Sequence, residues 1–254
     1  MYKIPANTLF MGQQLVFMPE CHSTNDLIQQ LIKQKGLTEG MVVITANQTA
    51  GRGQRGNIWF TEPGKNLTFS LALKPVFLPA RDHFMLNVIT SLAIRDCLVR
   101  WMPETNISIK WPNDVMIGNK KVCGILIENQ VSGLTISETV IGIGLNVNQE
   151  VFGLLTATSM MLASGKSHAL PVVFESLMES LESLYLQLRA GGHQSLRNRY
   201  TEVLFRRNES HRFMAGNKTF TGTITGISED GLLQVDDGNA VRTFQFKEIA
   251  YVID

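Results

Sequence analysis

A glycine- and arginine-rich segment directly after a run of β-forming residues is the feature that most limits how this chain can fold. The β-forming run covers 41–46, and the segment at 48–56 that follows has three glycines within six residues. Glycines let the backbone approach a ligand closely and turn its N–H groups inward. Arg52 and Arg55 add positive charge and fork-shaped donors that suit a phosphate or a carboxylate. The sequence therefore predicts a strand that ends in an anion-binding loop.

Two common nucleotide-binding motifs do not fit the sequence. A Walker loop needs lysine and then serine or threonine after Gly56, but Asn57 and Ile58 stand there. The Gly-Ile-Gly sequence at 142–144 begins like a dinucleotide fingerprint, yet Val147 occupies the place of the third glycine. The loop is therefore neither a standard nucleotide cradle nor half of a Rossmann site.

Composition and charge indicate a globular protein without a targeting segment. The 254 residues, 44% hydrophobic and 18% charged, are enough for one sizeable domain and a small one. The net charge of +1 gives no global field for nucleic acid or membrane, and no apolar run approaches the ~20 residues of a membrane span. Cys21, Cys97 and Cys123 have no paired spacing, which favours a reducing cytoplasm. The N-terminal residues lack a long apolar core, so no signal peptide is predicted.

Hydrophobic periodicity predicts an α+β domain with a mixed sheet at 1–207 and a small all-β domain at 208–254. Apolar residues recur at helical spacing in the segments 27–32, 84–101, 171–189 and 194–205. Short β-forming runs lie at 41–46, 66–73, 107–111, 114–117, 122–127 and 139–147. From about Glu209, glycines separate short strands, which predicts a small β-barrel or half-barrel. The Ser-Thr-Asn-Asp sequence at 23–26 is a candidate N-cap, and capping alone would explain it.

A second unusual cluster, Lys-Trp-Pro-Asn-Asp at 110–114, combines a lysine, an aromatic residue and a carboxylate. Pro112 breaks the strand pattern and puts Asn113 and Asp114 in a turn, and a turn alone would explain both residues. At a metal–nucleotide site, however, Asp114 would accept Mg²⁺ or order its water, and Lys110 would face phosphate oxygens. Both interpretations stay open from these residues alone.

The lysines at 120–121 open an apolar strand that also contains Cys123 and Gly124. Lys121 is either a surface lysine with a buried stem or a positive charge beside a reacting carboxylate and phosphate. Cys123 suggests a thiol nucleophile, but no histidine lies near it in the sequence to activate it, which favours a small buried residue. The five histidines are scattered without metal-ligand spacing.

Taken together, five motifs resemble one family, the biotin protein ligases, over nearly the whole chain. In that family's order, they are the segments 23–25, 51–56 with Trp59, 110–114, 121–124 and 142–146. The resemblance implies a catalytic domain like that of class II aminoacyl-tRNA synthetases and a C-terminal barrel like a Src-homology-3 domain. It also implies two half-reactions. The biotin carboxylate attacks the α-phosphate of Mg-ATP to give biotinyl-adenylate and pyrophosphate. A lysine on the biotin carboxyl carrier domain of a biotin-dependent carboxylase then accepts the biotin and releases AMP.

The resemblance assigns roles to particular residues. The catalytic residues it implies are Lys121, Arg52, Lys110 and Asp114, the last also a position for Mg²⁺ through water or phosphate. The biotin-binding residues it implies are Ser23, Thr24, Asn25, Gln48, Gly51, Arg52, Gly53, Gln54, Lys121 and Gly124. The residues it implies for ATP or the adenylate are Arg52, Arg55, Trp59, Lys110, Asn113 and Asn146. Because the adenylate is labile, the glycine loop is expected to close over it and exclude water.

The sequence departs from the family pattern at two places. Many members have arginine where Gln54 stands, a position linked to retaining the adenylate, and Arg55 could take over that role. Bifunctional members carry an N-terminal winged helix that represses transcription, whereas Ser23 lies too near Met1 for such a domain. We therefore expect a cytoplasmic ligase, a monomer or a homodimer, without a nucleic-acid or membrane partner.

Two other functions compete with the ligase. A lipoate or octanoate ligase or transferase would share the catalytic fold, and Cys123 is the only hint of its thiol chemistry. A non-catalytic biotin sensor could bind nucleic acid through a basic stretch, although a solvated helix face explains that stretch more simply. The stretch comprises Arg189, Arg197, Arg199, Arg206, Arg207 and Arg212. A binding protein of that kind would not need both Lys110 and Lys121, which favours the ligase.

Overall fold

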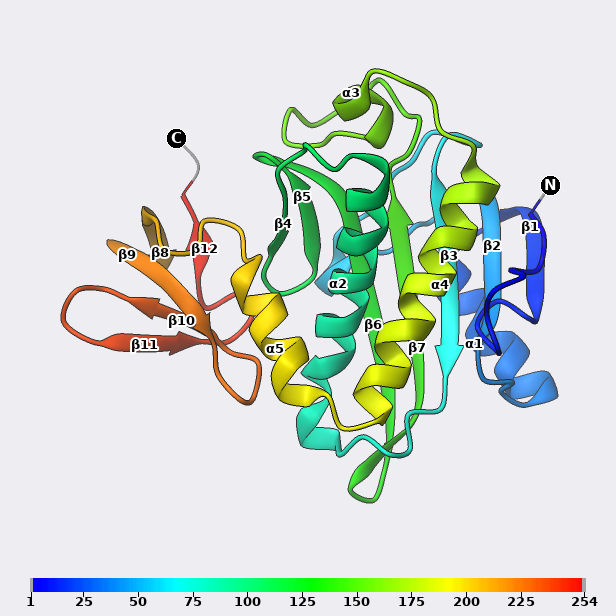
Figure 1. Ribbon diagram of the computed structural model, residues 1–254, viewed down its shortest axis with the longest axis horizontal. Helices are drawn as coiled ribbons and strands as arrows, with labels where there is room; N and C mark the ends of the chain where they lie inside the picture. Colours follow the sequence, from blue (N-terminus) through cyan, green and yellow to red (C-terminus); the bar gives the residue numbers. More distant parts are fainter. Residues whose placement is uncertain (1, 253–254) are drawn as a thin grey trace.

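The computed structural model describes residues 2–252, which form two β-sheets with helices packed against them (Figure 1). The seven-stranded sheet of this part of the chain contains β1 (Leu15–Cys21), β2 (Met41–Gln48), β3 (Leu67–Leu73), β4 (Ile107–Lys110), β5 (Asp114–Ile117), β6 (Lys120–Ser132) and β7 (Thr135–Leu145). The five-stranded sheet contains β8 (Ser210–Ala215), β9 (Lys218–Ile227), β10 (Leu233–Asp236), β11 (Val241–Phe244) and β12 (Ala250–Tyr251). The helices are α1 (Thr24–Lys35), α2 (Phe84–Trp101), α3 (Met160–Ser164), α4 (Leu170–Arg189) and α5 (His193–Glu202), with 3₁₀ turns η1 (Gln54–Gly56) and η2 (Ala80–Asp82).

The larger sheet is mixed, as the sequence predicts. Its strands follow the order β1-β2-β3-β7-β6-β5-β4, in which β1 and β2 are parallel and the other neighbours are antiparallel. The smaller sheet has the order β11-β10-β9-β8-β12 and is antiparallel throughout. The α+β class is therefore confirmed, and a small all-β unit follows the helices.

Alternate residues of the larger sheet serve two different cores. Val42 and Ile44 of β2 point into the main core, which α2 and α4 cover from one side (Figure 1). Met41 and Val43 point the other way, into a second core with Ile28 of α1. Helix α1 therefore covers the opposite face, where it packs on β2, β3 and β7. The rest of that face is available for a binding site.

The structure differs from the elements that the sequence predicts at β1 and at the end of α5. β1 was not predicted because its alternation is weak: it is a half-buried edge strand that contains Pro19 and Glu20. The helix predicted at 194–205 ends at Glu202 instead. The residues after it pair with β4, where the Ile109 N–H donates to the Val203 carbonyl at 2.9 Å and the Ile109 carbonyl accepts the Phe205 N–H at 2.8 Å. A competing tertiary hydrogen bond ended the helix, and local propensity carries no signal of it.

The two sheets share one hydrophobic core. Residues of β8, β9 and β10, such as Phe213 and Leu233, belong to the same buried cluster as the apolar face of α2. The Trp111 indole N–H donates to the Gly231 carbonyl across this junction at 2.9 Å. Gly231 has a φ of +80°, and a side chain there would collide with the Phe84 ring, so this position requires glycine.

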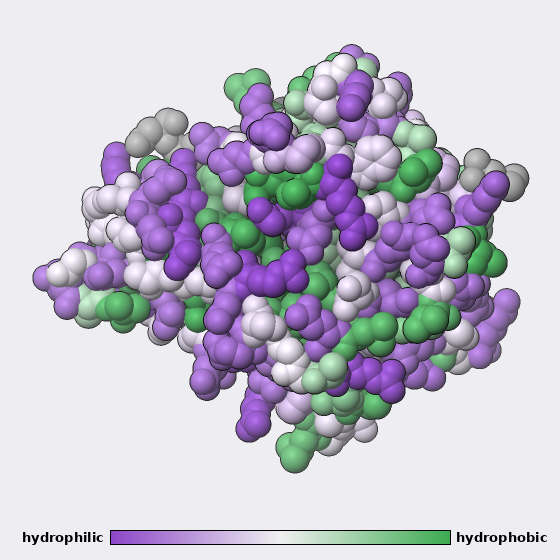
Figure 2. Space-filling model, in the orientation of Figure 1, coloured by the Kyte–Doolittle hydropathy of each residue, from purple (hydrophilic) through white to green (hydrophobic). Residues whose placement is uncertain are grey.

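The outer surface on the α2–α4 side is polar with separate apolar areas. Figure 2 shows this face, on which hydrophilic residues surround small hydrophobic areas. Within residues 2–252, no helix combines the length and the apolar character needed to cross a bilayer.

A buried carboxylate ties the N-terminal segment to α4. Glu182 is 5% exposed and accepts the backbone N–H groups of Leu9, Phe10 and Met11 at 2.7, 2.9 and 3.0 Å. We expect Glu182→Ala to lower the free energy of unfolding by about 2–4 kcal/mol, because three donors lose a charged acceptor. Urea denaturation measures this loss. The matched control is Glu175→Ala on the same helix, where the carboxylate accepts only the exposed Ala6 N–H at 3.3 Å. Equal losses in the two variants would contradict the prediction.

Candidate active site

A pocket opens on the uncovered face of the larger sheet, between the start of α1, the glycine-rich loop and strands β6 and β7. It brings together most of the residues predicted for the site. Those that line it are Ser23, Thr24, Asn25, Gln48, Arg52, Gly53, Gln54, Trp59, Asn113, Lys121 and Gly124. Gly51, Lys110, Asp114 and Asn146 lie outside this lining, and the side chain of Arg55 lies outside what the structure describes.

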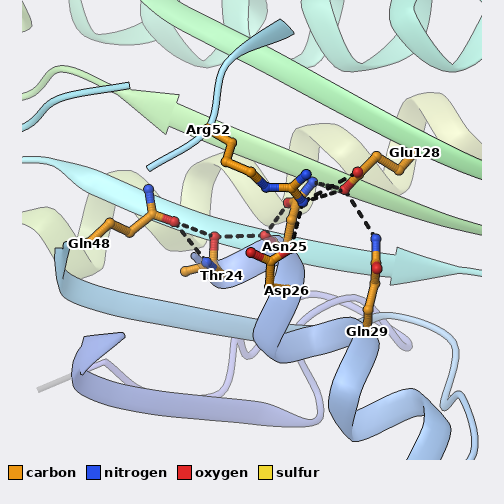
Figure 3. A network of polar contacts seen from close by, with 8 residues as sticks. Thr24, Asn25, Asp26, Gln29, Gln48, Arg52 and Glu128 are labelled. Carbon is orange, nitrogen blue, oxygen red and sulfur yellow. Dashed lines mark hydrogen bonds and ion pairs between the residues drawn. The ribbon is translucent and has the colours of Figure 1, made fainter. Parts of the chain in front are cut away.

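One end of the pocket is a buried hydrogen-bond network (Figure 3). The Gln48 Oε1 atom accepts the Thr24 N–H at 2.7 Å and the Thr24 hydroxyl at 3.1 Å. The Ser70 Oγ atom lies 2.7 Å from Thr24 Oγ1 and 2.5 Å from Asn25 Oδ1. Ser23 stands at the N-cap position of α1, but its side chain makes no capping bond. Helix capping therefore does not explain why serine stands at position 23, and Ser23 lines the pocket instead.

The glycine-rich loop is held to α1 and β6 by a charged network that the sequence did not reveal (Figure 3). Arg52 Nη2 lies 2.7 Å from Asp26 Oδ1 and 3.2 Å from Glu128 Oε2. The same Glu128 oxygen accepts from Asn25 Nδ2 at 2.7 Å and from Gln29 Nε2 at 3.1 Å. Glu128 thus links the loop to two residues of α1. It was missed because, within β6, nothing in the sequence separates it from an ordinary solvent-facing residue.

Glycines form the floor of the pocket because side chains would collide there. A Cβ atom at Gly142 would meet the Asn25 amide, and one at Gly144 would meet the Trp59 indole. A Cβ atom at Gly124 would lie 3.0 Å from the Trp59 ring and 3.1 Å from Lys121 Nζ. The Gly-Ile-Gly sequence that resembled a dinucleotide fingerprint therefore has a different physical reason. It lets polar and aromatic side chains approach the sheet closely.

Gly51 and Trp59 close the glycine-rich loop. The Trp59 N–H donates to the Gly51 carbonyl at 2.9 Å, and the Gly53 N–H donates to the Asn57 carbonyl at 2.7 Å. A Cβ atom at Gly51 would collide with the Trp59 carbonyl oxygen. Gly51 therefore shapes the loop from outside the pocket lining, and Trp59 is carried into the pocket.

Lys121 and Asp114 form a short ion pair at the other end of the pocket. Lys121 Nζ lies 2.6 Å from Asp114 Oδ1 and 5.4 Å from the centroid of the Trp59 ring. Asp114 lies at this position because it pairs with Gly124 in the register of β5 and β6. In the described part of the chain, no group of three or more histidine, cysteine, aspartate or glutamate side chains is placed to hold a metal ion. A metal at Asp114 would therefore take most of its ligands from a bound phosphate and water.

Two asparagines predicted for the site are buried beside it. Asn113 Nδ2 donates to the Ile125 carbonyl at 2.5 Å, and Asn146 Nδ2 donates to the Thr158 carbonyl at 3.0 Å. The Asn146 Oδ1 atom is buried and has no hydrogen-bond partner in the described residues. A buried acceptor without a partner costs free energy, so this oxygen is suited to accept a ligand N–H group.

Lys110 was expected at the nucleotide phosphates, but it lies outside the pocket lining and contacts the smaller sheet. Its ammonium lies over the Tyr251 ring of the smaller sheet, 4.8 Å from the ring centroid. Burial lowers the pKa of Lys110, the positive charges of Lys121 and Arg206 lower it further, and the negative charge of Asp114 opposes them. The sequence contained no signal for Tyr251, because the contact joins residues far apart in the chain.

The chain is similar in sequence to known biotin ligases. Residues 17–146 match the model of the biotin/lipoate A/B protein ligase family. The chain is 28% identical over 247 residues to the bifunctional ligase/repressor BirA of Bacillus spizizenii, covering 95% of this chain and 75% of the relative. It is 31% identical over 205 residues to the biotin–[acetyl-CoA-carboxylase] ligase of Paracoccus denitrificans, covering 78% and 85%.

A solved structure shares the fold. The biotin protein ligase from Aquifex aeolicus in complex with biotin and ATP superimposes with a TM-score of 0.79 at 23% identity, covering 95% of this chain and all of that one. The fold and the named relatives together show an enzyme of the ligase class. The chain belongs to the biotin/lipoate A/B protein ligase family.

Cys123 is unsuited to be a nucleophile in this site. Its side chain is completely buried, and burial raises the pKa of its thiol. We expect iodoacetamide to modify Cys123 only after the protein is unfolded, because the thiolate is the reactive form. The half-buried Cys21 is the internal control and is expected to react first. Peptide mapping by mass spectrometry measures both. Modification of Cys123 in the folded protein at the rate of Cys21 would contradict this assignment.

Proposed function

We propose that this chain is an ATP-dependent biotin protein ligase. It activates biotin to biotinyl-adenylate and transfers the biotin to one lysine of a biotin carboxyl carrier domain. Family membership and the named relatives support an enzyme that joins biotin to a carboxylase component. The observation that carries the proposal is a single pocket with a neutral hydrogen-bonding end and a cationic end, joined over a glycine floor.

The neutral end suits the ureido head of biotin. That head has one carbonyl acceptor and two N–H donors, and it carries no charge. Thr24, Asn25, Gln48 and Ser70 offer hydroxyl and amide groups in one buried network, so a ligand there finds both donors and acceptors. We include Ser23 in this set because it lines the pocket. A hydrophobic pocket with a few placed polar groups is the usual form of a small-molecule site.

The cationic end suits the meeting of two anions. A biotin carboxylate and the α-phosphate of ATP repel each other, and the negative charge that develops during attack must be stabilised by fixed donors and cations. Lys121 and Arg52 both line the pocket, and Arg52 is held by Asp26 and Glu128. We assign Lys121 to bridge the carboxylate and the phosphate, and Arg52 to bind phosphate and hold the loop closed. The N–H groups of Gly51, Gly53 and Gln54 belong to that loop, and Gly124 allows the close approach.

The nucleotide side is assigned to residues around Trp59. The unpartnered Asn146 Oδ1 atom is suited to accept a hydrogen bond from the adenine amino group, although Asn146 lies outside the pocket lining, whereas Asn113 belongs to that lining. Arg55 and Lys110 are assigned to the phosphates by the motif positions they occupy. Asp114 offers a carboxylate oxygen, which suits Mg²⁺ bound together with phosphate. That ion would neutralise charge on the phosphates.

Several features of the enzyme follow as parts of the same proposal. The residues at 208–254 form a Src-homology-3-like barrel that follows a catalytic domain at 1–207. The enzyme acts in the cytoplasm as a monomer or a homodimer and does not bind nucleic acid. The family also contains lipoate-handling proteins. The buried Cys123 disfavours a thiol acyl-enzyme, and the biotin–carboxylase relatives favour biotin.

Intact mass spectrometry of a carrier tests the function directly. The protein is incubated with biotin, Mg-ATP and a biotin carboxyl carrier domain, and we expect an ATP-dependent mass gain equal to one biotin less water. Replacement of the carrier's target lysine is expected to abolish the gain. Transfer of lipoate or octanoate in place of biotin would assign the protein to the sister branch. Binding without any transfer would favour a sensor.

Lys121→Ala tests the cationic end. We expect this variant to form adenylate about 100-fold or more slowly, because a cation at the reacting phosphate stabilises the transition state. Pyrophosphate release in the absence of a carrier measures this step. The matched control is Lys120→Ala, since the adjacent Lys120 is exposed and lies outside the pocket lining. Adenylate formation by Lys121→Ala at the rate of the control would refute the assigned role.

A further inference from the structure

We propose that Tyr251 is a positioning residue that holds the Lys110 ammonium for the phosphates of ATP. The smaller sheet would then supply part of the nucleotide side of the site. This inference rests on the proposed function, because it assumes that Lys110 serves a nucleotide. The observation behind it is the Lys110 Nζ atom, 4.8 Å from the centroid of the Tyr251 ring.

The aromatic partner leaves Lys110 free to bind an anion. Asp114 lies opposite Lys110 in the β4–β5 register, but its carboxylate pairs with Lys121 at 2.6 Å. A ring attracts the ammonium through its quadrupole without accepting all three N–H donors or cancelling the charge. A carboxylate partner would compete with phosphate for the same donors. Partial burial strengthens the attraction of the charge for an anion and is also why the pKa of Lys110 falls.

The Tyr251 ring is held firmly in its place. Tyr251 pairs with Phe213 across β12 and β8, and their ring centroids are 5.5 Å apart. The Phe205 ring packs on it at 6.0 Å, and the next residue, Val252, donates its N–H to the Arg212 carbonyl at 3.1 Å. Packing from two rings and a strand pair fixes the platform over which Lys110 lies.

Anchoring of β4 does not require this contact. Ile109 is already tied to the segment after α5 by two backbone hydrogen bonds, and Trp111 is tied to Gly231. Both neighbours of Lys110 are therefore fixed to the C-terminal part of the chain. The contact of Lys110 with Tyr251 adds orientation of one side chain rather than attachment of a strand. The Tyr251 hydroxyl is buried without a partner in the described residues, so the ring is the part that acts on Lys110.

A double-mutant cycle on Mg-ATP binding tests the inference. Calorimetry measures the Kd of Mg-ATP and of biotin for wild type, Tyr251→Leu, Lys110→Ala and the double variant. We expect Tyr251→Leu to raise the Kd of Mg-ATP about fivefold, the size of a partly exposed cation–π contact, and to leave the Kd of biotin within about twofold. In the Lys110→Ala background, Tyr251→Leu is expected to cause no further change. Tyr251→Phe, which keeps the ring, is expected to restore Mg-ATP affinity.

Three outcomes would overturn the inference. They are an unchanged Kd of Mg-ATP in Tyr251→Leu, an equal rise with and without Lys110, and a loss of biotin affinity as large as that of Mg-ATP. The last would indicate a purely structural role, which thermal unfolding of the same variants measures separately. The proposed function is tested separately, by biotin transfer with the wild-type protein. If wild type binds Mg-ATP but transfers no biotin, that function fails while the binding cycle still decides the role of Tyr251.

Discussion

The rest of the structure depends on β7, because one face of this strand must pack in the core while the other must leave room for a pocket. Ile141, Ile143 and Leu145 point into the main core under α2 and α4 and are nearly or completely buried. The residues between them, Gly142 and Gly144, leave room on the other face for the Asn25 and Trp59 side chains. Strand alternation thus lets one strand support the core and form the floor of a pocket. A larger residue at either glycine would fill the space that Asn25 and Trp59 now occupy.

The pocket has a hydrogen-bond network at one end, which Asn25 links to the Arg52–Glu128 ion pair, and a second ion pair at the other. Thr24 and Gln48 form the neutral end, whereas Lys121 carries positive charge at the other. Two cations that line the pocket are paired with carboxylates, Arg52 with Asp26 and Glu128, and Lys121 with Asp114. Such pairs keep the cations in place before an anion arrives. The smaller sheet contacts Lys110 through the Tyr251 ring.

Much of the fold and of the site could be predicted from the sequence, and the misses share one physical reason. The helix at 84–101 and the strand at 114–117 have the predicted bounds, because each is a largely apolar run that ends beside a turn-forming residue, Pro103 or Gly118. β1, the early end of α5, Glu128 and Tyr251 were missed. Each of them is set by a partner distant in the chain. β1 pairs with β2, and the residues after α5 pair with Ile109. Glu128 pairs with Arg52, and Tyr251 contacts Lys110.

By itself, the sequence determined the residue types that the chemistry needs and their order along the chain. Glycines at 51, 53 and 56 and lysines at 110 and 121 indicate an anion site, because close backbone approach and fixed cations are local properties of residues. Only the tertiary structure decided which of those residues share one pocket and what each one contacts. It paired Asp114 with Lys121 and placed the Lys110 ammonium against Tyr251 of the smaller sheet. Such pairings depend on strand register and sheet order, which arise from packing between distant segments.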